Sequence, residues 1–166
     1  MEFKISREFL SEIEQLISEN KAQELLLLLE DIHFADIAEI MEELDDHGAA
    51  YIFNTLDSEK TAEILLELDD EVREKILRNL SPKEIAEELD ELSTDDAADI
   101  IAELPQHKKE QVISELEDVE HAKDIVDLLR YDEDTAGGLM GKELVKVNEN
   151  WNVLTCVKEM RLQAEN

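Results

Sequence analysis

The feature that most constrains the fold is a 24-residue pattern that occurs twice in succession between Asp57 and Leu104. The first copy reads DSEKTAEILLELDDEVREKILRNL, and the second, which follows without a gap, reads SPKEIAEELDELSTDDAADIIAEL. Weaker copies occupy 33–56 and 105–129, the last with a one-residue slip. Self-similarity at a fixed period is typical of repeat proteins, in which each unit packs on its neighbours. The apolar pairs shared by the two central copies are Ala62 and Ala86, Leu65 and Leu89, Leu68 and Leu92, Ile76 and Ile100, Leu77 and Ile101, and Leu80 and Leu104.

Each unit is predicted to contain two short helices. Ser81, Pro82 and Glu84 match a helix start, with a hydroxyl at the N-cap, proline at N1 and glutamate at N3 for a capping box. The stretch 93–96, Ser-Thr-Asp-Asp, repeats this capping chemistry for a second helix. Helices of about 11 residues are marginal alone, so each must bury its apolar face on its neighbours. The predicted fold class is therefore all-α, a superhelical array of short antiparallel helix pairs.

The composition is strongly acidic, with 45 Asp and Glu against 16 Lys and Arg and a formal net charge of −29. Such a surface repels nucleic acid and anionic lipid head groups, so neither is an expected partner. It suits cations or a basic protein partner. The simpler alternative is that the glutamate-rich helix faces are only solvated.

The pattern changes after Leu129, which predicts three segments. Residues 1–130 form the helical-repeat domain, and 131–141, with three of the four glycines, form a connector. In 142–166 four basic and four acidic residues balance, and a short strand at 144–147 and a helix at 153–160 are expected. One strand and one helix cannot build a core, so this segment is interpreted as the incomplete start of a second domain.

Other classes of site are not indicated. Cys156 is the only cysteine, which excludes an internal disulfide framework and favours a reducing compartment. The longest apolar run, Leu25–Leu29, is too short to cross a bilayer, and no signal peptide is evident, so no direct membrane insertion is expected. This leaves open that the chain is the soluble portion of a membrane protein. The four histidines show no metal or catalytic spacing, and an enzyme is not expected.

Two carboxylates are candidates for binding a metal ion. Asp95 and Asp99 are four residues apart on the predicted second helix of the third unit, so they share one face. Asp95 lies in the first turn, where the helix dipole already explains a negative charge. Asp99 lies deeper, where aspartate is a mediocre helix former and repels Asp95. A divalent cation would relieve this repulsion, and a solvated face is the alternative.

The available ligand atoms are oxygens, which points to Mg²⁺ or Ca²⁺. No EF-hand loop is present, which disfavours tight calcium binding. Scattered acidic pairs that become sites only against a facing domain suit Mg²⁺, because this ion keeps several waters and takes only one or two carboxylates.

The chain resembles a known family. The acidic repeats, LSTDDAADIIAEL at 92–104 and YDEDTAGGLM at 131–140 resemble the cytosolic N-terminal domain of MgtE magnesium transporters. The tail at 139–161 resembles the first strand and helix of the CBS domain that follows in that family.

The resemblance implies a cytosolic, magnesium-sensing regulatory domain of a multi-pass, homodimeric membrane channel. Mg²⁺ ions bound between the N and CBS domains would favour the closed state. The implied metal ligands are Glu63, Asp95, Asp99 and the backbone carbonyl of Gly138. The implied partners are Mg²⁺ and the CBS and transmembrane domains of the same full-length chain, which also supply the rest of each site.

A second reading belongs to a different class. Acidic helical repeats also occur in protein-interaction scaffolds, and the flagellar motor switch protein FliG has a related helical fold. On this reading the acidity serves solubility or docking and no ion is sensed. A second CBS motif and five apolar spans in a longer chain would decide between the two.

Overall fold

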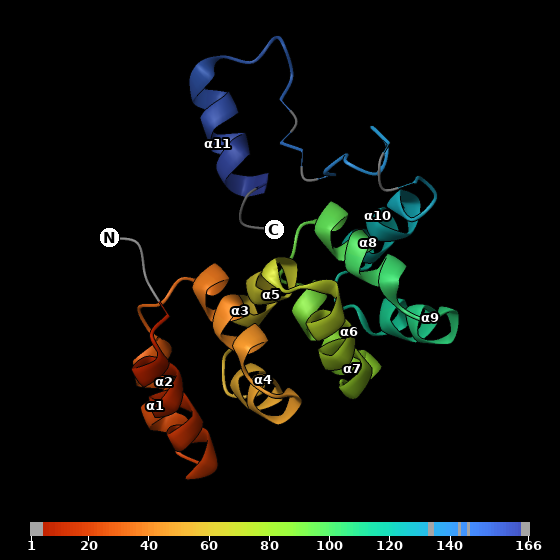
Figure 1. Ribbon diagram of the computed structural model, residues 1–166. Coiled ribbons are helices and arrows are strands. Elements are labelled where there is room, and N and C mark those ends of the chain that lie inside the picture. The colour runs from red at the N-terminus through yellow and green to blue at the C-terminus, as the bar shows by residue number, and fades with distance from the viewer. Residues whose placement is uncertain (1–4, 133–134, 143, 146, 164–166) are drawn as a thin grey trace.

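The computed structural model describes residues 5–132, 135–142, 144–145 and 147–163, and all regular structure within these ranges is helical (Figure 1). The predicted all-α fold is confirmed. In chain order the helices are α1 (Arg7–Ser18), α2 (Ala22–Leu29), α3 (Phe34–Glu43), α4 (Asp46–Phe53), α5 (Ser58–Glu67), α6 (Asp70–Asn79), α7 (Pro82–Leu89), α8 (Thr94–Glu103), α9 (Gln106–Glu115), α10 (Val119–Leu128) and α11 (Val153–Gln163).

The helix starts reproduce the repeat that the sequence contains. The first helices of successive units, α3, α5, α7 and α9, begin 24 residues apart, at 34, 58, 82 and 106. The second helices, α4, α6 and α8, begin 24 residues apart at 46, 70 and 94, and α10 begins 25 residues later at 119. The extra residue is the predicted one-residue slip in the fourth unit.

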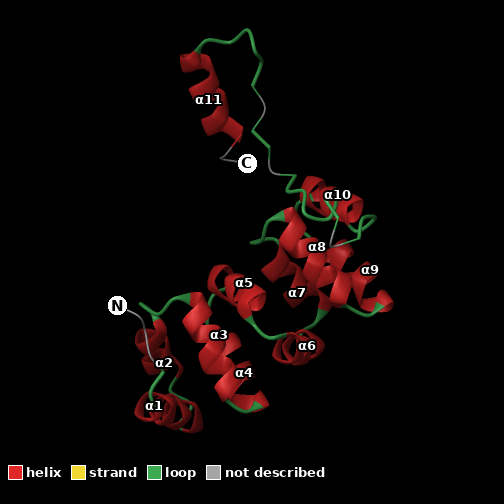
Figure 2. Cartoon of the chain, turned by 45° about the horizontal axis from the view of Figure 1, so that its top comes forward, coloured by secondary structure: helices red, strands yellow, loops and turns green. Residues whose placement is uncertain are grey.

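The repeats stack into two layers of helices. In one layer α3 packs on α5, α5 on α7 and α7 on α9, while in the other α4 packs on α6 and α8 on α10. Helices α1 and α2 pack on each other, and α1 also contacts α4, so this pair covers the first end of the array. Figures 1 and 2 show the units following one another from α1 to α10, with α11 apart from them.

The core contains mainly Leu, Ile and Ala, as the composition predicts. The expected interior residues Ile76 and Ile100 are 5% and 2% exposed, and a continuous apolar cluster runs from α1 to α10. The fourth unit departs from the expected pattern, because Val126 is exposed and Leu128 is buried. No further repeat follows α10 within the described residues, so its outer face lacks the neighbour that covers the equivalent residue Ile101 in α8.

Local caps define most of the helix ends. Ser81 and Glu84 form the predicted capping box at the start of α7. Asn20 follows α1 with a φ of 55°, and the amides of Asn20 and Lys21 donate to the carbonyls of Ile17 and Leu16. This is a Schellman end, in which asparagine takes the left-handed conformation that other side chains resist. Helix α2 therefore starts in a fixed direction, and it ends at Leu29.

Basic side chains stabilise several helix C-termini. The ammonium of Lys108 donates to the carbonyls of Leu77 and Leu80 at the end of α6, at 2.6 and 2.7 Å. Lys60 lies two repeats before Lys108, and its ammonium donates to the carbonyls of Leu29 and Glu30 at the end of α2. The last carbonyls of a helix carry partial negative charge and lack intrahelical partners, so a cation there satisfies both needs.

The C-terminal segment agrees with the prediction only in part. Helix α11 covers the predicted helix at 153–160. Leu144, Val145 and Val147, the described residues of the predicted strand, are not in a strand, and position 146 lies outside the described residues. A strand needs a neighbour for its backbone hydrogen bonds, and none of the described segments supplies one. Within the same ranges, no helix has both the length and the apolar character required to cross a bilayer.

Candidate functional site

The first turn of α8 holds two acidic side chains around one hydroxyl group. The hydroxyl of Ser93 lies 2.8 Å from a carboxylate oxygen of Asp95 and 2.6 Å from one of Asp96. Ser93 was predicted to cap α8 by accepting a backbone amide, but its side chain makes no such bond. The hydroxyl has a single proton, so it can donate to only one carboxylate at a time. The start of α8 therefore holds two carboxylates beside one shared hydroxyl group.

Asp99 follows one turn later on α8, four residues after Asp95, as the sequence predicts. Both side chains are half-buried. The helix itself is held in place by buried Ala97, Ile100 and Ile101 and packs mainly on α10. The structure thus presents Asp95 and Asp99 on a rigid element rather than on a loop.

Glu63, by contrast, lies on α5 and is exposed to solvent. The main neighbours of α5 are α3 and α7, whereas those of α8 are α10 and α9. Across the described part of the chain, no group of three or more His, Cys, Asp or Glu side chains is arranged to hold a metal ion. The structure therefore does not gather Glu63 with the α8 carboxylates into one complete site.

Gly138 lies in the connector and is buried. Its amide donates to the hydroxyl of Thr135 at 3.3 Å, and the same hydroxyl donates to the carbonyl of Asp132 at 2.7 Å. Four residues after Gly138, the amide of Lys142 donates to the hydroxyl of Thr94 at 3.1 Å. Thr94 is the first residue of α8 and precedes Asp95, so the connector is attached to the same helix end as the acidic turn.

Two residues of this region were not predicted from sequence. Thr94 is 3% exposed, and the ammonium of Lys142 pairs with Asp127 of α10 at 2.8 Å. One signal was present for each. Thr94 stands in the Ser-Thr-Asp-Asp stretch that marks a helix start, and Lys142 is the first residue of the segment where the net charge becomes neutral.

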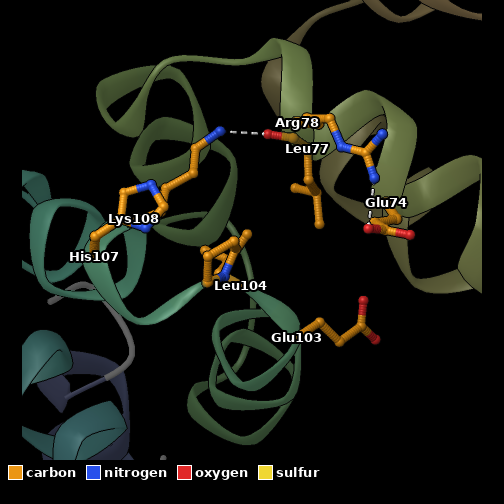
Figure 3. A pocket seen from close by; sticks show the side chains of 8 residues that line it. Glu74, Leu77, Arg78, Glu103, Leu104, His107 and Lys108 are labelled. Carbon is orange, nitrogen blue, oxygen red and sulfur yellow. Dashed lines mark hydrogen bonds and ion pairs between the residues drawn. The ribbon is translucent and has the colours of Figure 1, made fainter.

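One cavity lies elsewhere, between α6, the end of α8 and the start of α9 (Figure 3). Its volume is about 270 Å³, and apolar Leu77, Leu104 and Pro105 line it together with charged side chains of both signs. Figure 3 shows Arg78 turned toward Glu74 and Lys108 turned toward the carbonyl of Leu77, so both cations have partners. None of the four predicted metal ligands lines this cavity.

Comparison with known proteins gives the chain its place. Residues 32–134 match the family described as the MgtE intracellular N domain. One solved structure, "Crystal structure of the cytosolic domain of the Mg2+ channel MgtE in complex with ATP", is 31% identical with a TM-score of 0.82 and matches over 94% of this chain and 64% of that one. A second, "Crystal structure of the soluble part of a magnesium transporter", is 24% identical with a TM-score of 0.76 and matches over 94% and 61%.

This chain thus spans about three fifths of the length of these solved structures. No curated protein matches it in the sequence comparison. The family match covers well over half of the chain, including the repeats and both α8 aspartates, and the solved structures share its fold. The chain belongs to the MgtE intracellular N domain family.

Proposed function

We propose that this chain is the magnesium-sensing regulatory domain of an MgtE-type Mg²⁺ transporter or channel, on the cytoplasmic side of the cell membrane. Its acidic face binds Mg²⁺ against a following CBS domain, and the bound ions favour the closed state of a homodimeric protein. The observation that carries the proposal is the acidic first half of α8, with Asp95 and Asp99 on a buried, rigid helix beside the connector. Family membership supports the choice of ion.

In this proposal, electrostatic repulsion between two acidic domains favours the open state. The chain carries a net charge of −29, and a facing domain that also carries carboxylates is repelled when no cation intervenes. Two unit charges about 4 Å apart repel by roughly 1 kcal/mol in water and roughly 4 kcal/mol at an effective dielectric constant near 20. A few such pairs separate two domains, and divalent ions between them remove the repulsion.

Several ions must act together for such a sensor to work. An ion at its half-saturating concentration stabilises the bound state by only about 0.4 kcal/mol. Several weak sites filled over the same range add their contributions and give a graded response. Mg²⁺ suits this design, because it keeps several waters and takes one or two carboxylates from each segment. Glu63, Asp95, Asp99 and the Gly138 carbonyl are the proposed contributions of this chain.

The proposed ligands require a facing domain, since the described residues alone form no group of three acidic or histidine ligands. Exposed apolar side chains in the C-terminal segment support the proposal that this domain packs there. Helix α11 exposes Val153 and Leu154 by 77% and 78%, and the loop before it exposes Leu144 by 67%. Apolar surface of this extent needs a covering structure. We propose that 142–166 opens a CBS domain, whose remaining residues cover it.

The alternative hypothesis, a protein-interaction scaffold, predicts a different response to Mg²⁺. If the acidity serves only solubility, Mg²⁺ screens the charge as any divalent cation does, and no particular pair of aspartates matters. The two functions therefore differ in whether two defined side chains set the magnesium dependence.

The test is limited proteolysis of the full-length transporter across a Mg²⁺ titration, comparing wild type with Asp95→Asn/Asp99→Asn. We expect magnesium protection of the wild type, and in the variant a midpoint raised by roughly fivefold, corresponding to about 1 kcal/mol of lost ion binding. The control variant Glu8→Gln/Glu12→Gln removes the same charge at the same spacing on exposed positions of α1. Equal curves for the α8 variant and the wild type would remove these aspartates from the sensor.

A further inference from the structure

In the structure the connector runs on to Lys142, one residue beyond the predicted end at 141, and its part 135–142 is attached to the helical array. Its last residue, Lys142, makes two contacts with two different helices. The backbone amide of Lys142 donates to the hydroxyl of Thr94 at the start of α8, and its ammonium pairs with Asp127 near the end of α10 at 2.8 Å. Because α8 and α10 pack on each other, one residue of the connector bridges a helix pair that is already fixed.

The ion pair between Lys142 and Asp127 is more sheltered than the second ion pair on the same carboxylate. The side chain of Lys142 is 21% exposed and that of Asp127 is 39% exposed, whereas the Arg130 partner on the other oxygen of Asp127 is 72% exposed. The hydrogen bond from Lys142 lowers the pKa of Asp127, and the same bond raises the pKa of Lys142. Both groups therefore remain charged at neutral pH, and the pair persists there.

A third contact fixes the glycine turn. A Cβ added at Gly137 would lie only 2.4 Å from a ring carbon of Tyr131, so glycine is the residue that lets the backbone lie against this ring. Gly138 follows directly, and Thr135 holds its amide. The turn is therefore packed on one side by Tyr131 and anchored on the other by Lys142.

We propose that Thr94, Asp127 and Lys142 are positioning residues that hold the connector beside the acidic turn of α8. This inference rests on the proposed function, and it adds residues that are not metal ligands. These three residues, here called the clamp, set where the Gly138 carbonyl lies relative to Asp95. They also set the direction in which the chain leaves toward the following domain. A clamped connector lowers the entropy cost of assembling an ion site from two segments.

The clamp makes a prediction that does not involve magnesium. In the 166-residue chain without divalent ions, Lys142→Gln and Asp127→Asn each remove the ion pair. We expect amide hydrogen exchange in 136–142 to rise by about threefold, as suits the loss of one partly buried pair. Arg130→Gln is the matched control, because it removes the exposed pair on the same carboxylate. The double variant Asp127→Lys/Lys142→Asp swaps the two charges, and we expect it to restore slow amide hydrogen exchange.

The second arm tests the link to function in the full-length transporter. Lys142→Gln is expected to raise the Mg²⁺ midpoint for protection from proteolysis by about twofold to threefold, with Arg130→Gln unchanged and the charge exchange restored toward wild type. Faster exchange with an unchanged midpoint would overturn the positioning role while leaving the sensor intact. No change in exchange would overturn the clamp itself. Failure of the proposed function is separate, because it appears as an unchanged midpoint in Asp95→Asn/Asp99→Asn.

Discussion

The carboxyl group of Glu88 has a pKa well above its ordinary value. It lies half-buried on α7, and its carboxylate accepts a hydrogen bond from the buried hydroxyl of Thr61 on α5 at 2.5 Å. Its pKa is raised to about 7, mainly by burial; the hydrogen bond from Thr61 opposes this rise, and the nearby charges of Glu87, Glu91 and Asp57 contribute to it. The contact between two successive repeats thus contains a carboxyl group that is partly protonated near neutral pH.

A raised carboxyl pKa has a definite consequence for stability. The folded state holds the proton of Glu88 to higher pH than the unfolded state, so its contribution is fully present below about pH 4.5 and is lost as pH rises through 7. We expect Glu88→Gln to raise the free energy of unfolding at pH 8 by roughly 1 kcal/mol, a value reduced for partial exposure, and to have little effect at pH 5.

Urea unfolding at both pH values measures this difference. Glu39→Gln is the control, because it removes one charge from an exposed position of α3. An equal effect of Glu88→Gln at pH 5 and pH 8 would show that burial does not shift this group.

At the scale of elements, Arg73 on α6 joins the end of α5 to the end of α8. From α6 its guanidinium binds both carboxylate oxygens of Glu103 at the end of α8, at 2.7 and 3.0 Å. It also donates to the carbonyls of Leu65 and Leu68 at the end of α5. The side chain is only 12% exposed, so these bonds are sheltered from water.

Lysine at this position would keep the charge but lose the planar fork. We expect Arg73→Lys to lower the free energy of unfolding by about 1–3 kcal/mol, since a lysine cannot reach the carboxylate and both carbonyls together. Arg78→Lys is the matched control, because Arg78 lies five residues later on α6 and pairs with Glu74 while its side chain is 68% exposed. Thermal unfolding that ranks the two variants equally would contradict the role assigned to Arg73.

The repeat period predicted the helix starts because apolar spacing and caps such as the Ser81–Glu84 box are local in sequence. The contacts of Arg73 and Lys108 with helix ends depend on how units stack, so local spacing could not reveal them. Ser93 had the right residue type for a cap, but two adjacent carboxylates take its hydroxyl. Of the candidate site, the position of Asp95 and Asp99 on one face of a helix was predictable from helix geometry. The attachment of Lys142 to Thr94 joins residues 48 apart and was not.

For the whole molecule, the net charge of −29 is the dominant electrostatic fact. The repulsion is spread over the array, and ions in solution screen it within about 10 Å at 0.1 M salt. We expect sodium chloride to raise the melting temperature of the 166-residue chain. Mg²⁺ at matched ionic strength should raise it slightly more, since no group of three ligands exists within the described residues.

Calorimetry across both titrations checks this expectation. A large, saturable excess for Mg²⁺ would indicate that the chain holds a complete site of its own. A melting temperature that does not respond to sodium chloride would contradict the importance of self-repulsion.

In the proposed function, Asp95 and Asp99 make this domain a magnesium sensor that favours channel closure. The most direct measurement is current through the full-length protein in excised membrane patches, recorded while Mg²⁺ on the cytoplasmic side is raised. We expect wild-type current to fall as Mg²⁺ rises, and Asp95→Asn/Asp99→Asn to need several-fold more Mg²⁺ for the same closure, whereas Glu8→Gln/Glu12→Gln follows the wild type. Superimposable inhibition curves for the α8 variant and the wild type would contradict it.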